Sequence, residues 1–227
     1  MSMLPAGAAI WPNLIQQSEQ WFKARAGRAT ASQFSRIITT VRGELSVARR
    51  DYIHELLGQR NAPYEVPKFT GSFWTDRGNE LEAEARAMFC ADMGVKVDQV
   101  GFVTHERWGH VVGSSPDGLI LNAGAALYVA GLEIKALMAK NHVAIWDHGT
   151  MPDDYKQQVH GALAVTGLPC WWFMSYHPAM RPFYQKIERN AYTDKLADAL
   201  DAFVVEYGAV SEKLGPKLRP LENDQPL

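Results

Sequence analysis

Cysteine is scarce in this 227-residue sequence, which contains only Cys90 and Cys170. Neither belongs to a Cys-x-x-Cys pair or to a Cys/His cluster, so the sequence predicts neither a zinc site nor an iron–sulfur cluster. Cys90 falls in a helical pattern and Cys170 in an apolar strand run. We therefore expect two buried thiols rather than a disulfide.

Long apolar runs and an excess of basic charge are also missing. No run of about 18 apolar residues occurs, and the N-terminus has no charged segment followed by an apolar one, so we expect a soluble, cytoplasmic protein. The net charge is −2 and the pI is about 6.4. This balance neither supports nor excludes a DNA substrate, because acidic residues at a nuclease metal site offset a basic groove.

The residues that are present favour one mixed α/β domain with a central sheet flanked by helices. Hydrophobic residues make up 47% of the chain, which is ample for a core. Helical patterns come first, strands follow, and the two types then mix, without the regular alternation of a doubly wound sheet or its Gly-rich phosphate loop. The expected parts of the single domain 1–227 are an arm at 1–16, a helical part at 17–60, a core at 74–210 and a tail at 211–227.

Apolar periodicity and capping residues predict the individual elements. The expected helices cover residues 19–25 after Ser18, 33–39 after the Thr30–Ser32 cap, 47–59, 75–93, 141–146, 155–166 and 193–210, the last capped by Thr193. The expected strands cover residues 95–103, 110–113, 118–121, 127–135, 169–175 and 184–189.

The sequence Ser-Ser-Pro-Asp-Gly, ending at Gly118, and the later Glu133-Ile134-Lys135 suggest a magnesium-dependent nuclease centre. Because side chains alternate along a strand, Glu133 and Lys135 share one face, and Asp117 can lie beside Glu133 if the two strands pair. Two carboxylates and a lysine suit phosphodiester hydrolysis with a hard cation. The alternative is an ordinary turn followed by an exposed strand edge.

A third carboxylate would help to hold a metal or orient its water, and the helix at 75–93 offers Glu80 and Glu82. The two are about 200° apart around a helix and cannot face one site. Glu82 lies next to the buried stripe marked by Leu81 and Ala85, so we favour Glu82. The alternative is a solvated helix face.

Two further groups of residues suit an anionic ligand. Arg25, Arg28, Ser32 and Arg42 provide guanidinium and hydroxyl donors near a helix start, which could select a terminal phosphate. Gln158, three residues after Tyr155 on one helix face, could bind a phosphate or hold the lysine. Ordinary surface charge is the alternative for both groups.

In this order and spacing, the motifs resemble the phage lambda exonuclease family, the YqaJ-type viral recombinase nucleases of the PD-(D/E)xK superfamily. The matching segments are Trp-x-x-x-Arg25-x-Gly with the later Thr-Ala-Ser32, Arg-Gly-x-x-x-Glu82, Ser-Pro-Asp117-Gly with Leu-Glu-Ile-Lys135, and Tyr-x-x-Gln158-Val. The similarity covers roughly residues 18 to 210.

The resemblance implies a restriction-endonuclease-like core and a 5′→3′ exonuclease that acts on double-stranded DNA. Such an enzyme requires Mg²⁺, one or two ions per site with Mn²⁺ as a substitute, and prefers a 5′-phosphorylated end. It releases 5′-mononucleotides and leaves 3′ overhangs. The resemblance further implies a ring-shaped homotrimer that works with a single-strand annealing protein in phage recombination.

Individual roles follow from the matching positions. The implied metal ligands are Asp117, Glu133 and the backbone carbonyl of Ile134, with Lys135 as the catalytic lysine and Glu82 beside the metals. The helical part at 17–60 would hold the 5′-phosphate. The implied phosphate contacts are Arg25, Ser32, Gln158 and, in a loop that departs from the family pattern, Arg42.

The segment after the lysine also departs from the family, which has there an arginine that can wedge into the DNA end. Residues 136–142 of this chain contain no arginine, so either Lys140 substitutes for it or the wedge is missing. Two other functions stay open: a different PD-(D/E)xK nuclease, such as a RecB-like end-processing enzyme or an endonuclease, and a catalytically silent scaffold that binds DNA ends.

Overall fold

The computed structural model describes residues 3–62, 73–109, 111–122 and 124–218, and the side chains of 73–79 lie outside that description. The α-helices are α1 Glu19–Arg25, α2 Arg49–Asn61, α3 Phe73–Met93, α4 Ala139–His148, α5 Lys156–Thr166 and α6 Ala191–Leu218. Short 3₁₀ helices are η1 Ala31–Arg36, η3 Glu106–Trp108 and η4 Asp153–Tyr155. The strands are β1 Ala8–Ile10, β2 Ala29–Thr30, β3 Lys96–Asp98, β4 Val103–His105, β5 Val112–Ser114, β6 Gly118–Leu121, β7 Tyr128–Ala136, β8 Cys170–Tyr176 and β9 Phe183–Glu188.

The strands form two mixed sheets with helices packed against them, which confirms the α/β class but divides the expected single sheet. The larger sheet has the order β3-β6-β7-β8-β9, in which only β7 and β8 are parallel. The smaller sheet has the order β1-β4-β5-β2, in which only β2 and β5 are parallel. The parallel β7–β8 pair requires a crossover, and α4 and α5 provide it.

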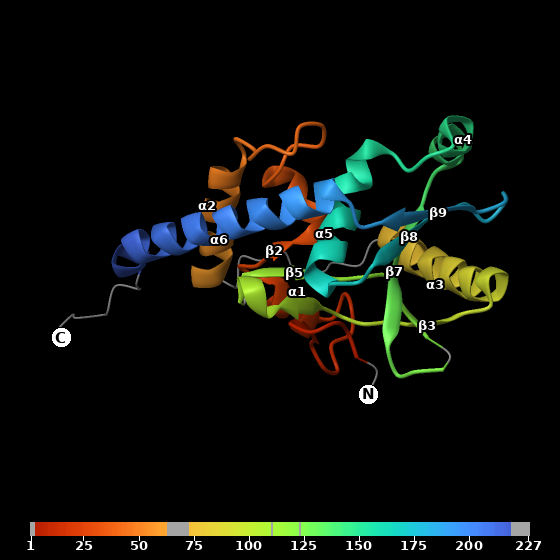
Figure 1. Cartoon of the computed structure of the whole chain (residues 1–227), viewed down its shortest axis with the longest axis horizontal. Coiled ribbons are helices and arrows are strands. Elements are labelled where there is room, and N and C mark those ends of the chain that lie inside the picture. The colour runs from red at the N-terminus through yellow and green to blue at the C-terminus, as the bar shows by residue number, and fades with distance from the viewer. Residues whose placement is uncertain (1–2, 63–72, 110, 123, 219–227) are drawn as a thin grey trace.

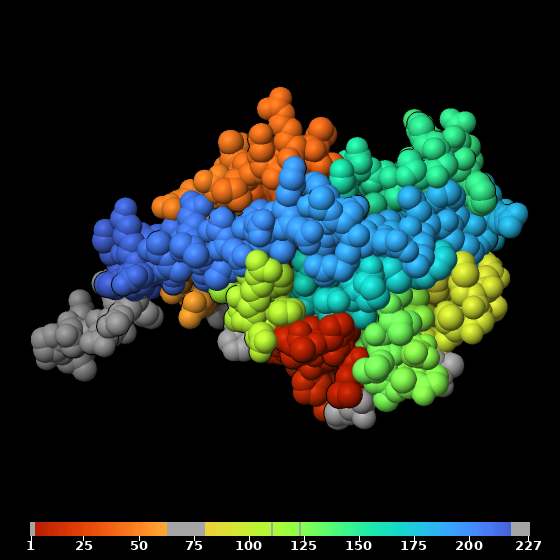
Figure 2. Space-filling model, in the orientation of Figure 1, coloured from red at the N-terminus to blue at the C-terminus, as the bar shows by residue number. Residues whose placement is uncertain are grey.

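Alternating side chains of the larger sheet face two different helical layers. Met174 of β8 packs with Phe89 of α3, whereas the adjacent Phe173 packs with Ile145 of α4 and Val159 of α5. The third core cluster joins the 3₁₀ helix η1 and the helices α2, α5 and α6 over the smaller sheet. Figure 1 shows α6 beside α2 and α5, and Figure 2 shows it as a long blue band along the surface. Helix α5 therefore lies between the two parts of the fold.

Local chemistry explains most element boundaries. The Ser18 side chain accepts a hydrogen bond from the Trp21 amide and caps α1, as its position predicts. Helices α4 and α5 end at Gly149 and Gly167, which both have φ of +69°, a conformation that glycine adopts without strain. No helix in the described part of the chain is long and apolar enough to span a lipid bilayer.

Three expected elements differ from the structure by more than two residues or in kind. The predicted strand at 95–103 is two strands in different sheets, β3 and β4, and between them Gly101 lies so close to Leu14 that a Cβ atom would be 2.1 Å from the Leu14 carbonyl oxygen. The predicted helix at 33–39 is instead the 3₁₀ helix η1, which starts and ends earlier. Helix α6 starts before Thr193, with the Asn190 side chain accepting from the Tyr192 amide, and it continues to Leu218.

The expectation of two buried thiols is only partly met. Cys90 and Cys170 are free, and each is half-buried rather than buried. The break expected between residues 60 and 74 lies largely outside the described residues, as does the end of the expected tail after residue 218.

Candidate active site

A cavity of about 240 Å³ lies where the larger sheet meets α1, η1 and α5. Its walls include eight of the residues that the sequence singles out: Arg25, Ser32, Glu82, Asp117, Glu133, Ile134, Lys135 and Gln158. The remaining lining residues are Gln16, Trp21, Thr30, Ala31, Ser114 and Ser115. The predicted metal site and the predicted phosphate site are therefore parts of one cavity.

The end of strand β6 places Asp117 against β7. Gly118 pairs with Leu132, so Asp117 comes level with Glu133 at the point where the β6–β7 ladder stops. The Asp117 carboxylate accepts a hydrogen bond of 2.6 Å from the Ile134 amide, in place of the next ladder bond. Gly118 is required there because a Cβ atom would lie 2.2 Å from the Val97 side chain. The aspartate is thus fixed by backbone pairing rather than by flexible side-chain contacts.

Lys135 lies on the same face of β7 as Glu133, as the strand period predicts. Its Nζ is 2.7 Å from a Glu133 carboxylate oxygen and donates to Gln158 Oε1 at 3.1 Å. Gln158 Nε2 donates in turn to Glu133 at 2.6 Å. The ammonium group also lies 4.9 Å from the ring centroid of Tyr155, which stacks on Phe173. These contacts, which come from α5 and from Tyr155 just before it, orient the lysine toward the carboxylates.

Glu82 reaches the cavity from α3, whereas Glu80 is exposed, as the helical spacing predicts. Arg86, one turn further along α3, forms an ion pair with Glu82. The same guanidinium donates through Nε to the backbone carbonyl of Asp117 at 2.8 Å. Arg86 therefore ties the third carboxylate and the Asp117 turn to one helix.

Burial of three neighbouring carboxylates raises their pKa values. Desolvation and then the charge of Asp117 raise the pKa of Glu82 to about 7 and the pKa of Glu133 to about 8. Burial also raises the pKa of Asp117, although Lys135 opposes this change. Burial disfavours the Lys135 ammonium, yet the charges of Glu133 and Asp117 raise the pKa of Lys135. Three carboxylates are thus crowded at one end of the cavity, where Lys135 and Arg86 are the cations in contact with them.

The carboxylate oxygens of Glu82, Asp117 and Glu133 are the type of ligand that a hard divalent cation prefers. The charge of Asp117 raises the proton affinity of Glu82 and Glu133, and a bound cation with a preference for oxygen ligands would relieve this repulsion. Among the described residues, however, no three His, Cys, Asp or Glu side chains stand in a ready ligand arrangement. Glu82 is engaged by Arg86, and Glu133 by Lys135 and Gln158. Metal binding would therefore require these side chains to exchange partners.

Arg25 carries a largely buried positive charge without a carboxylate partner among the described residues. Its guanidinium donates to Ser115 Oγ at 2.9 Å and to Thr30 Oγ1 at 3.4 Å, and it lies 4.1 Å from the ring centroid of Trp21. Burial lowers the pKa of Arg25 to about 10. Ser32 lies beside this group, with its Oγ 3.4 Å from Thr30 Oγ1. A buried guanidinium surrounded by hydroxyl groups is a site for an anion.

The sequence patterns missed several residues that build this cavity. Ser115 had a usable signal, because it stands two residues before Asp117 and so shares its side of the extended chain. Arg86 also had one, as an arginine four residues after Glu82 on a helix. Gln16 had none: its amide donates to the carbonyls of Val100 and Pro116 across long sequence separations.

Two predicted phosphate or DNA contacts lie outside the cavity. Arg42 and Lys140 are exposed, the first on the loop after η1 and the second in the first turn of α4. Neither lines the cavity, so their proposed contacts stay predictions about bound DNA. His160, which follows Val159 on α5, faces away from the site, and its Nδ1 lies 2.7 Å from Thr193 Oγ1.

Residues 20–169 match the family of YqaJ-like viral recombinase domains. No curated protein sequence matches the chain. Among solved structures, the alkaline exonuclease LHK-Exo from Laribacter hongkongensis is similar, with 29% identity, a TM-score of 0.73 and coverage of 88% of this chain and 97% of that protein. LHK-Exo has also been solved in complex with dAMP.

A phage-related exonuclease from Haemophilus somnus 129PT is more distant. It shares 14% identity with a TM-score of 0.54, and the alignment covers 82% of this chain and 96% of that one. This likeness supports the fold alone. The family match spans the cavity residues from Trp21 of α1 to Gln158 of α5 and leaves out Gln16 of the cavity lining.

Proposed function

Because the chain belongs to the family of YqaJ-like viral recombinase domains, we propose that it is a Mg²⁺-dependent nuclease that degrades double-stranded DNA from its 5′ ends. The likeness to an alkaline exonuclease over most of both chains favours exonuclease activity. Mn²⁺ would substitute for Mg²⁺, because both accept oxygen ligands.

One observation carries the proposal: the carboxylates line the same cavity as Arg25, which has no carboxylate partner among the described residues. A site for a metal alone needs no buried guanidinium, and a phosphate-binding site alone needs no cluster of carboxylates. A nuclease that recognises a terminal phosphate needs both, close enough that binding the end presents the first diester to the reacting groups.

The proposed metal ligands are Asp117, Glu133 and the Ile134 carbonyl, with Glu82 as a further carboxylate. When bound, one or two Mg²⁺ ions would lower the pKa of a water and stabilise charge on the phosphate. Lys135 is the proposed catalytic lysine. Its ammonium group, held by Glu133 and Gln158, is placed to orient the attacking water or to stabilise the developing negative charge.

The proposed 5′-phosphate pocket consists of Arg25, Ser32 and Gln158, to which the cavity geometry adds Ser115. A terminal phosphate carries more charge than an internal diester and so gains more from an unpaired guanidinium. Holding that phosphate would expose the first diester of the 5′ strand to hydrolysis. Repeated cleavage would release 5′-mononucleotides and leave a 3′ overhang, the substrate of a single-strand annealing partner.

We further propose, from the family resemblance, a ring-shaped homotrimer and a role in phage recombination. Arg42 and Lys140 are proposed to contact DNA outside the cavity, because both are exposed cations. If Lys140 separates the two strands, Lys140→Ala should slow the cleavage of duplex DNA more than the cleavage of single-stranded DNA.

A doubly labelled duplex tests the polarity and the phosphate preference. We expect label at a 5′ end to appear first as a mononucleotide, and a 5′-phosphorylated duplex to be degraded faster than its 5′-hydroxyl counterpart. Earlier release of the 3′ label would contradict the polarity. Equal initiation on both kinds of end would remove the proposed phosphate pocket.

A further inference from the structure

Strand β9 forms an outer edge of the larger sheet, with β8 as its neighbour on one side only. Cys170 of β8 pairs with Glu188, and the amide of Arg189 donates to the Pro169 carbonyl, so the Arg189–Pro169 pair is a hydrogen-bonded one. Such pairs recur at every second residue of an antiparallel ladder. The amides and carbonyls of Tyr184, Lys186 and Glu188 therefore point outward, away from β8.

These outward groups have no backbone partner among the described residues. They are spaced along a strand that is extended over its whole length, from Phe183 to Glu188. A side chain can form a hydrogen bond with only one or two of these amides and carbonyls. Another strand can form hydrogen bonds with all of them, because its own amides and carbonyls have the same spacing. The chemistry of this edge thus favours an extended polypeptide over a small molecule.

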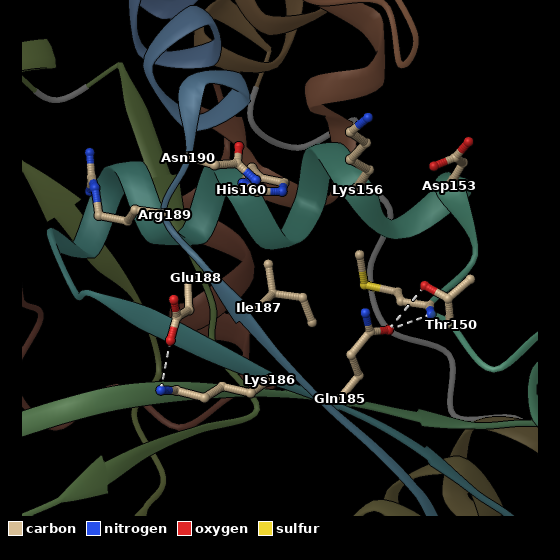
Figure 3. A pocket seen from close by; sticks show the side chains of 11 residues that line it. Thr150, Asp153, Lys156, His160, Gln185, Lys186, Ile187, Glu188, Arg189 and Asn190 are labelled. Atoms are coloured by element: carbon tan, nitrogen blue, oxygen red, sulfur yellow. Dashed lines mark hydrogen bonds and ion pairs between the residues drawn. The ribbon is translucent and has the colours of Figure 1, made fainter.

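Hollows flank this edge at both ends. One, of about 560 Å³, lies between the chain at 185–190 and the segment leading into α5, with Thr150, Lys156 and His160 on its other side. Figure 3 shows α5 above this space and the side chains of Ile187 and Gln185 pointing into it from β9. Among the described residues, a hollow thus separates this part of β9 from α5.

The second hollow, of about 610 Å³, adjoins the other half of β9. It is lined by Met93 at the end of α3 and by Trp146 of α4, together with residues 181–184. Because α3 and α4 pack on opposite faces of the sheet, a hollow that touches both lies at the sheet edge. Trp146 is 44% exposed there and packs edge-on against Phe183.

We propose that the β9 edge binds an extended segment of a partner protein as a sixth, antiparallel strand. A second copy of β9 fits less well, because the chain turns into α6 at Ala191. With Lys186 placed opposite Glu188 of the copy, that helix would begin just beyond Tyr184 and would end the strand pairing there.

Charge complementarity specifies the partner segment. Lys186 and Glu188 are exposed and form a pair at 2.9 Å on one face of β9. A partner residue directly opposite Lys186 would be acidic, and one opposite Glu188 basic, because cross-strand neighbours of opposite charge attract. The residue opposite Tyr184 would be aromatic and would adjoin the hollow beside Trp146.

This edge and the candidate active site can be occupied at the same time. Lys156 and His160 line the hollow beside β9, whereas Gln158 lines the catalytic cavity. Residues two apart on a helix point in nearly opposite directions. Binding at β9 is therefore expected to leave DNA cleavage unchanged, which suits a surface that recruits a partner.

A peptide containing Lys-Val-Glu-Val-Tyr provides the probe, with its lysine designed to lie opposite Glu188. Fluorescence anisotropy would compare this peptide with two N-methylated forms. Methylation of the Glu amide blocks a hydrogen bond to β9 and is expected to weaken binding at least about tenfold. Methylation of the first Val amide, which points away from β9, is expected to have little effect.

Matched variants of the full chain locate the binding site. Lys186→Pro removes an outward amide that β8 does not use, and proline is tolerated on an edge strand. We expect Lys186→Pro to keep the melting temperature and the DNA cleavage of the wild type but to lose peptide binding. The control variant Lys186→Thr keeps the backbone amide and should still bind the peptide.

Absence of binding to the wild type at millimolar peptide would overturn the proposal, as would equal binding of all three peptides. Self-association of the wild type that Lys186→Pro abolishes would assign the edge to a second copy and would also overturn it. Failure of the chain to cleave DNA would refute the proposed nuclease function without affecting the peptide measurement.

Discussion

Replacing Arg25 by alanine would separate recognition of a 5′-phosphate from the chemistry of cleavage. Arg25 donates to Ser115 and Thr30 and lies over the Trp21 ring, but it has no carboxylate partner among the described residues. If a terminal phosphate is its missing counter-ion, the variant loses a charged hydrogen bond to the substrate. Such a bond contributes about 1.5–3 kcal/mol, which corresponds to a roughly 10- to 150-fold change in rate.

The same substitution has a small expected effect on folding. Burial lowers the pKa of Arg25 from its ordinary value to about 10. This change corresponds to roughly 3 kcal/mol of disfavoured charge, which offsets the hydrogen bonds and the ring contact that the alanine removes. We therefore expect the free energy of unfolding to change by no more than about 1 kcal/mol.

The assay compares initial cleavage of 5′-phosphorylated and 5′-hydroxyl duplexes by the wild type, Arg25→Ala and Arg36→Ala. Arg36 is a matched control, because it forms ion pairs with Asp51 and Glu55 and does not line the cavity. Only Arg25→Ala should reduce the preference for the phosphorylated end. A variant that unfolds readily yet keeps the full preference would show that Arg25 is structural and would refute the reasoning.

Other substitutions test the lysine, the packing and a buried histidine. Lys135→Ala should abolish cleavage in gel assays while binding to DNA ends persists, and a retained rate would refute its catalytic role. Gly161→Ala should lower the free energy of unfolding by roughly 1–3 kcal/mol, because its Cβ would lie 2.3 Å from the Phe34 ring, whereas Gly208→Ala meets no neighbour and should be neutral or stabilising. Burial and two nearby cations lower the pKa of His160 to about 4, so the unfolded state takes up the proton first as the pH falls. Urea unfolding should therefore show a loss of about 2 kcal/mol between pH 7 and pH 5, and His160→Gln should remove that part of the loss.

The sequence predicted the meeting of the carboxylates and Lys135 in one cavity because this part of the site depends on local periodicity. Strand alternation placed Glu133 and Lys135 on one face, and helical spacing chose Glu82 over Glu80. The pairing of β6 with β7 then brought Asp117 to the Ile134 amide. These relations need only the period of one element and the contact of two neighbouring strands.

The rest of the site depends on contacts that sequence spacing does not encode. Gln16 holds the carbonyl of Pro116, and Trp21 donates to the Ser115 hydroxyl, in both cases across more than 90 residues. The two sheets divide at a segment in which Gly101 lies against Leu14, again across a long sequence separation. Such packing follows from the tertiary fold, so local patterns predicted one continuous strand there.

The most direct test of the central claim compares a linear duplex with a closed circular duplex, each with Mg²⁺ and with EDTA. The account predicts that the linear DNA is degraded from its ends in Mg²⁺, that EDTA abolishes this activity, and that the circle stays intact. Cleavage of the circle would identify an endonuclease, and an intact linear duplex in Mg²⁺ would identify a silent end-binding protein. Either result would contradict the proposed function.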